Sequence, residues 1–85
     1  VGQYHKAIQR LEAFLPLARS PQDQAGEAEA LSNLGIAYQE TGRYGQAIAT
    51  QQQAGKLMLA LGNRPALGQV LSNLGNAFEA VGAYD

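Results

Sequence analysis

The sequence predicts an all-α fold of about four helices, and three observations carry this prediction. Apolar residues recur every three or four positions, which is the spacing of one helix face. A long stretch repeats itself after 40 residues, so the chain contains equivalent helical units. Glycine, proline and asparagine gather between the apolar stretches, where turns are expected. We expect helices near 4–19, 23–41, 44–61 and 66–81, followed by a short stub.

The repeat is clearest in two segments of eight residues. Residues 31–38 read Leu-Ser-Asn-Leu-Gly-Ile-Ala-Tyr, and residues 71–78 read Leu-Ser-Asn-Leu-Gly-Asn-Ala-Phe. A Gly-x-Tyr triplet that begins at Gly2 returns at Gly42 and again at Gly82. These identities fall at small and apolar positions, which are the positions that pack. Each unit is therefore expected to hold two helices joined by a short turn.

Proline, glycine and polar capping residues set the expected helix ends. Pro16 lies inside the first helix and predicts a kink, because proline removes a backbone hydrogen bond. Ser20-Pro21 and Asn63-Arg64-Pro65 have the form of helix starts, with a polar cap and a proline in the first turn. Thr41-Gly42 and Val81-Gly82 have the form of helix ends, because glycine is favoured just past the last turn.

Two glycines fall inside the expected helices at the same register. Gly35 and Gly75 are 40 residues apart and lie beside the apolar face. Glycine within a helix costs about 1 kcal/mol relative to alanine. We therefore expect both glycines to mark a close approach between two helices.

Composition excludes several classes of function. Six Lys plus Arg against seven Asp plus Glu give a net charge of −1, whereas nucleic-acid binding needs a basic stripe. The chain has no cysteine, hence no disulfide, thiolate metal site or thiol nucleophile. Its longest apolar run, Leu57 to Leu61, is far too short to span a membrane. The chain begins at Val1 with neither an initiator Met nor a signal-peptide pattern, so we expect a piece of a longer, by default cytoplasmic, protein.

No arrangement of residues predicts catalysis. His5 is the only histidine, and no serine has a base assigned to it by spacing. Glu27 and Glu29 are two residues apart, so they point to different faces of a helix and form no acid–base pair. Neither a phosphate-binding glycine loop nor metal-ligand spacing is present. We expect no enzyme activity, no cofactor and no metal.

The repeated residues resemble the tetratricopeptide repeat (TPR) family. Its pattern is a large apolar residue, two spacers, Leu-Gly, two spacers and Tyr, then Gly-x-Tyr and an alanine-rich second helix. The matching positions are Leu31, Leu34, Gly35, Tyr38, Gly42, Tyr44, Ala47 and Ala54, then Leu71, Leu74, Gly75, Phe78, Gly82 and Tyr84. The spacing of 40 is similar to that of Pins/LGN, kinesin-light-chain and bacterial TPR arrays. Gln51 stands where an aromatic is usual and Gly55 where Leu is usual, so we expect looser packing in this repeat.

The resemblance implies an α-solenoid, a right-handed superhelix of antiparallel helix pairs. In that family the first helix of each pair lines a concave groove. The expected division of the chain is the second helix of a partial repeat over 1–24, a complete repeat over 25–64, and the first helix of the next repeat with a stub over 65–85.

The resemblance also implies a function, a non-catalytic protein–protein interaction scaffold that binds a peptide or partner segment in the groove. The residues expected to face the groove are Glu29, Ser32, Asn33, Ile36, Gln39, Glu40, Gln69, Ser72, Asn73, Asn76 and Glu79. Asn33 and Asn73 are one repeat apart, and their amides can pair with a peptide backbone or instead with a neighbouring helix.

Charge placement predicts a neutral to basic protein or peptide partner, and neither nucleic acid nor membrane. The expected first helices carry Glu27, Glu29, Glu40 and Glu79, with no basic residue apart from Arg64 at a helix start. The expected second helices carry Lys6, Arg10 and Lys56.

The alternative function is a structural spacer or self-assembly element. A repeat stack leaves an apolar face at each open end, and about three units are needed to bury a continuous core. We therefore also expect end-to-end self-association.

Overall fold

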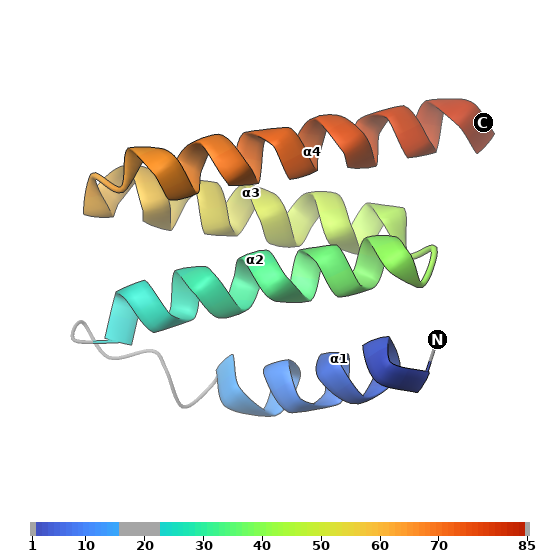
Figure 1. Cartoon of the computed structure of the whole chain (residues 1–85), viewed down its shortest axis with the longest axis horizontal. Coiled ribbons are helices and arrows are strands. Elements are labelled where there is room, and N and C mark those ends of the chain that lie inside the picture. The colour runs from blue at the N-terminus through green and yellow to red at the C-terminus, as the bar shows by residue number, and fades with distance from the viewer. Residues whose placement is uncertain (1, 16–22, 85) are drawn as a thin grey trace.

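The computed structural model describes residues 2–15 and 23–84, and every regular element in these ranges is a helix. The helices are α1 (Gly2–Phe14), α2 (Gln24–Glu40), α3 (Tyr44–Leu61) and α4 (Arg64–Tyr84). Each runs opposite to the one before it, and α1 and α4 lie at opposite edges of the molecule (Figure 1). α2 packs on α1 and α3, and α4 packs on α3 with a smaller contact to α2. The predicted all-α fold of antiparallel helix pairs, a helical solenoid, is confirmed.

Two helix-ending turns are built in the same way, each around a glycine. Gly42 has φ +81 and Gly62 has φ +71, the left-handed conformation that side chains disfavour. After α2, the backbone N–H of Arg43 donates to the carbonyl of Tyr38 at 2.8 Å. After α3, the N–H of Asn63 donates to the carbonyl of Met58 at 3.0 Å. Both turns are Schellman motifs, which satisfy carbonyls left over at a helix end.

The predicted helix start at Asn63-Arg64-Pro65 is confirmed. α4 begins at Arg64, and the side-chain Oδ1 of Asn63 accepts a hydrogen bond from the N–H of Ala66 at 3.2 Å. An N-cap side chain of this kind satisfies one of the four N–H groups that the first helical turn leaves unpaired. The proline in the next position loses nothing there, because its missing N–H would be unpaired in any case.

The predicted bounds of two helices are wrong. α1 begins at Gly2 and ends at Phe14, rather than spanning 4–19, while the kink at Pro16 and the start at Ser20-Pro21 lie outside the described residues. α4 continues through the predicted turn at Val81-Gly82 as far as Tyr84. At the equivalent Gly42, the turn leads into α3, which packs back on α2. No described helix follows Gly82 to pack back on α4 in this way.

The close approach predicted for Gly35 is confirmed, and the one predicted for Gly75 is wrong. A Cβ placed on Gly35 would lie 2.5 Å from the Nε2 of Gln51 on α3. A Cβ placed on Gly75 would have nothing within 4 Å. The difference arises because α4 has no described helix in the position that α3 takes beside α2.

The core lies along α2 and the faces of α1, α3 and α4 that meet it or each other. Its members recur at helical spacing, and they are Ile8, Leu15, Ala28, Ala30, Leu31, Leu34, Ala37, Tyr38, Ala47, Ala54, Met58 and Val70. Gln51 is only 1 % exposed and lies among these core residues. Its Nε2 donates to the carbonyl of Ser32 at 2.8 Å, and its Oε1 is buried without a hydrogen-bond partner.

Candidate functional site

The residues predicted to face a groove all lie on α2 or α4, which run in the same direction in Figure 1. The exposed ones are Glu29, Asn33, Glu40, Gln69, Ser72, Asn76 and Glu79. Ile36 and Gln39 are half-buried, and Ser32 and Asn73 are buried. The structure therefore places most of the predicted set at the surface, and it separates two members of it from solvent.

The two repeat-equivalent asparagines differ in environment. Asn33 is exposed, whereas Asn73 is 9 % exposed, with its Oδ1 accepting from the Nε2 of Gln69 at 3.5 Å and its Nδ2 buried without a partner. Asn73 lies between Val70 and Ala77 on a stripe whose two apolar members are fully buried. α4 packs on α3 and also on α2, which lies two helices earlier in the chain. No described helix lies two places before α2, so Asn33 lacks this second neighbour. The asparagines therefore do not form a row of equally accessible amides here.

The two equivalent serines differ for the converse reason. Ser32 is buried beneath Gln51 of α3, whereas Ser72 on α4 is exposed. In the described part of the chain, no helix follows α4 to cover Ser72 as α3 covers Ser32. The exposure of a predicted groove residue thus depends on which neighbouring helix is present.

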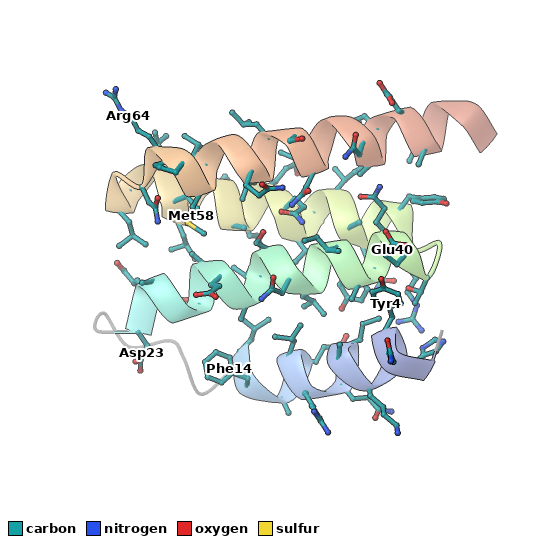
Figure 2. All side chains as sticks on the ribbon, viewed as in Figure 1. Tyr4, Phe14, Asp23, Glu40, Met58 and Arg64 are labelled. Carbon is teal, nitrogen blue, oxygen red and sulfur yellow. The ribbon has the colours of Figure 1, made fainter. Side chains whose placement is uncertain are left out.

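Charges on the helices follow the predicted division. Glu27, Glu29 and Glu40 lie on α2, and Glu79 lies on α4, whose first residue is the cation Arg64. Figure 2 labels Glu40 and Arg64 at opposite ends of their helices. The cations Lys6 and Arg10 lie on α1, and Lys56 lies on α3. The half-buried Glu27 is in the first turn of α2, where a negative charge interacts favourably with the helix dipole.

A hydrogen bond from Tyr38 fixes α2 against α1. The Tyr38 hydroxyl donates to the Oε2 of Glu12 at 2.5 Å, and the Tyr38 side chain is 5 % exposed. Burial first, and then the hydrogen bond and the negative charge of Glu12, raise the pKa of Tyr38 from 10.0 to about 12, against a lowering by Arg43. A tyrosine held protonated in this way is a structural link and not a proton donor near neutral pH.

The sequence reasoning missed an apolar crevice between α3 and α4. Its volume is about 470 Å³, and its lining residues are Gln52, Gly55, Lys56, Leu59, Leu67, Leu71 and Leu74. Leu59 is 69 % exposed and Leu71 is 57 % exposed. One signal in the sequence could have found it, namely glycine instead of leucine at 55. A smaller hollow of about 200 Å³ lies at the turn between the same helices, near Met58 and Asn63.

The described residues contain neither a metal-holding cluster nor a membrane-spanning helix. In residues 2–15 and 23–84, no group of three His, Asp or Glu side chains is placed to hold a metal ion. None of the described helices is long and apolar enough to cross a bilayer.

Comparison with known families agrees with the repeat. A family model for the tetratricopeptide repeat matches residues 1–60 and again residues 27–85, so the two matches together cover the whole chain. None of the curated proteins compared with the chain matches it. Tetratricopeptide repeats generally mediate protein–protein interaction as non-catalytic scaffolds that bind proteins or peptides. With helix pairs, repeat and family match in agreement, the chain belongs to the tetratricopeptide repeat family.

Proposed function

We propose that the chain is a non-catalytic protein-binding module that holds a peptide or partner segment against α2 and α4. The observation that carries this proposal is a set of exposed polar side chains on these two helices, called here the groove surface: Glu29, Asn33, Glu40, Gln69 and Asn76. Side-chain amides offer both a donor and an acceptor, which are the groups that pair with the backbone of an extended peptide.

The other predicted residues enter the proposal according to their burial. Four of them flank the groove surface. Ile36 and Gln39 are half-buried, and Ser72 and Glu79 are exposed. Ser32 and Asn73 are buried, so we assign them packing beneath the surface and not direct contact with a partner.

We propose a partner that is neutral to basic. Three carboxylates lie on α2 and one on α4, and α2 carries no Lys or Arg along its length. Opposite charge on the partner would speed the encounter and set its orientation more than it would raise the final affinity.

We also propose that the repeat boundaries follow the helix pairs. α2 and α3 share the largest helix–helix contact, which supports one complete repeat over 25–64. On this division, 1–24 holds the second helix of a partial repeat and 65–85 holds the first helix of the next.

The test is a peptide selection followed by variants of the groove surface. Peptides are selected on the immobilised chain from a library of random 12-residue sequences, and their affinities are measured by calorimetry. We expect Asn33→Ala with Asn76→Ala to weaken binding about tenfold or more, since each removes a hydrogen-bonding amide. The matched control is Gln53→Ala, which truncates an exposed amide on α3. Equal affinity for all three proteins would contradict the proposal.

A second candidate function, a spacer or self-assembly element, is favoured by one observation. Leu71 and Phe78 on α4 are 57 % and 54 % exposed, whereas their repeat equivalents Leu31 and Tyr38 are each 5 % exposed. Apolar side chains gathered on one helix face in this way are typical of an interaction surface.

A further inference from the structure

We propose that α4 binds α1 of a second copy of this chain, so that copies join head to tail in solution. This gives the self-assembly candidate a defined interface, and it uses a face of α4 other than the groove surface. The face, called here the docking face, consists of Leu71, Gly75 and Phe78, which follow one another at i, i+4 and i+7.

The internal repeat shows what kind of helix fits the docking face. Its equivalents on α2 are Leu31, Gly35 and Tyr38, all of them buried. There Gly35 lies against Gln51 of α3, while the Tyr38 hydroxyl donates to Glu12 of α1. On α4 both apolar side chains are more than half exposed, and nothing lies within 4 Å of a Cβ placed on Gly75. The docking face is therefore shaped for a helix of the α3 type.

α1 is that type of helix, and its own matching face is open. The α3 residues buried at the equivalent positions are Ala47, Thr50, Gln51 and Ala54. One repeat earlier, α1 carries Ala7, Arg10, Leu11 and Phe14, of which Ala7 and Leu11 are half-buried and Arg10 and Phe14 are exposed. Figure 2 shows Phe14 at the end of α1 nearest the start of α2, where its ring would be 4.0 Å from a Cβ on Gly26. The contact leaves Phe14 44 % exposed.

The two open faces are complementary in size. If α1 of a second copy takes the place that α3 takes beside α2, Leu11 lies over Gly75 as Gln51 lies over Gly35. Phe14 then occupies the position of the smaller Ala54. Gly68, which stands on α4 where α2 has Ala28, leaves additional room on that side because nothing lies within 4 Å of its Cβ position.

The charges are complementary as well. In an antiparallel pair with this register, residues before Leu11 on α1 lie beside residues after Gly75 on α4. Exposed Lys6 of one copy then approaches exposed Glu79 of the other. Arg10 takes the place of the buried Thr50, so its apolar stem is covered and its charged end reaches the rim beside Glu79. Such rim charges add little affinity, but they favour this register over others.

The order of helices makes the assembly open-ended. In the assembly, α4 of one copy serves as the first helix of a repeat and α1 of the next copy as its second helix. First and second helices therefore continue to alternate from copy to copy, as they do within one chain. A heterologous interface of this kind leaves a free α1 at one end and a free α4 at the other, so it grows into chains unless it closes into a ring.

The experiment compares blocking variants of each face, alone and mixed. Gly75→Glu places a charged side chain where Leu11 would dock, and it leaves the monomer intact because that space is empty. Phe14→Lys removes the aromatic ring from the opposite face and places a cation at the end of α1, where the helix dipole favours it. The control is Gly45→Glu, a matched change at an exposed position on α3 with nothing within 4 Å. Circular dichroism checks that each variant keeps its helicity.

Molar mass is measured by light scattering and sedimentation velocity across a concentration series. We expect the mass of the unchanged chain and of Gly45→Glu to rise with concentration, and self-association of either blocking variant to weaken about tenfold or more. A mixture of the two blocking variants should form a one-to-one heterodimer that does not grow, because each supplies the face that the other lacks. Asn33→Ala should associate as the unchanged chain does, since it alters only the groove surface.

Three results would overturn the proposal. A constant monomer mass for the unchanged, helical chain would mean that the docking face has no affinity for a second copy and is left to a helix from another source. Undiminished association of Gly75→Glu would mean that the copies meet elsewhere. A mixture of the blocking variants that stays monomeric would exclude the head-to-tail pairing of α4 with α1.

Discussion

Gln51 of α3 lies directly against Gly35 of α2, so closely that a Cβ on Gly35 would be 2.5 Å from the Nε2 and 2.8 Å from the Cγ of Gln51. The same amide group donates to the carbonyl of Ser32 at 2.8 Å. Because Gln51 is 1 % exposed, its side chain cannot turn out into solvent without moving the residues around it. The missing side chain at Gly35 is therefore what allows α2 and α3 to pack at this distance.

We predict that Gly35→Ala destabilises the chain, by about 1–3 kcal/mol, because the added methyl overpacks the contact with Gln51. The matched control is Gly75→Ala at the equivalent position on α4, where the space is empty. That change should stabilise the monomer by about 0.5–1 kcal/mol, because alanine is the better helix former. Urea unfolding followed by circular dichroism measures both. A stabilising Gly35→Ala would show that the contact is looser than described.

A double-mutant cycle tests whether the two residues act as a pair. Shortening Gln51 to Ala removes the atoms that Gly35→Ala would strike. We therefore expect the double variant to be more stable than the sum of the two single changes predicts, by about 0.5–3 kcal/mol. Additive free energies of unfolding would contradict the contact.

Gln51→Met should be close to neutral or stabilising, by up to about 1 kcal/mol. The buried Oε1 of Gln51 has no hydrogen-bond partner, so its burial costs free energy that an apolar side chain of similar length avoids. The lost hydrogen bond to Ser32 partly offsets this gain. Thermal unfolding gives the difference directly, and a loss of more than about 2 kcal/mol would mean that Oε1 is satisfied in solution.

Tyr38→Phe should cost roughly 0.5–1.5 kcal/mol near neutral pH through loss of the hydrogen bond to Glu12, and should change how stability depends on alkaline pH. Since folding raises the pKa of Tyr38 to about 12, the folded chain keeps between pH 10 and 12 a proton that the unfolded chain has lost. The stabilisation of the folded state by the protonated Tyr38 hydroxyl is fully present below pH 10 and is lost as pH rises through 12. Urea midpoints at pH 9 and pH 11.5 should therefore differ less for Tyr38→Phe than for the unchanged chain.

Asn63→Ala should destabilise the chain by about 1 kcal/mol, because the N–H of Ala66 loses the side-chain acceptor that caps α4. The matched control is Asn76→Ala, a change at an exposed position inside the same helix. That control should not destabilise, since alanine is favoured within helices. Equal losses for the two variants would show that the cap contributes nothing.

Local sequence signals predicted α2, α3 and the turns that end them well. α3 spans the predicted 44–61, and α2 differs from its prediction by one residue at each end, because apolar spacing and glycine or asparagine caps act within a few residues. The end of α4 could not be predicted in this way, since Gly82 carries the same local signal as Gly42 and only packing of a following helix distinguishes them. Gly75 and Gly35 differ for the same reason.

The candidate site was predictable as a set of helices but not as a surface. The repeat register put every predicted residue on α2 or α4, as observed. It could not separate Asn33 from Asn73, or Ser72 from Ser32, because equivalent residues receive different neighbours along the stack. The crevice beside Gly55 was missed since it is formed by two helices that are not equivalent in the repeat.

The most direct test of the proposed function is an NMR titration of the ¹⁵N-labelled chain with a selected peptide, read at the backbone amides and at the side-chain amides of Asn33 and Asn76. We predict that the shift changes gather on the groove surface of α2 and α4 and spare the exposed amides of α1. Changes centred instead on Leu59, Leu67 and Leu71 would place the peptide in the crevice between α3 and α4 and would contradict the proposal.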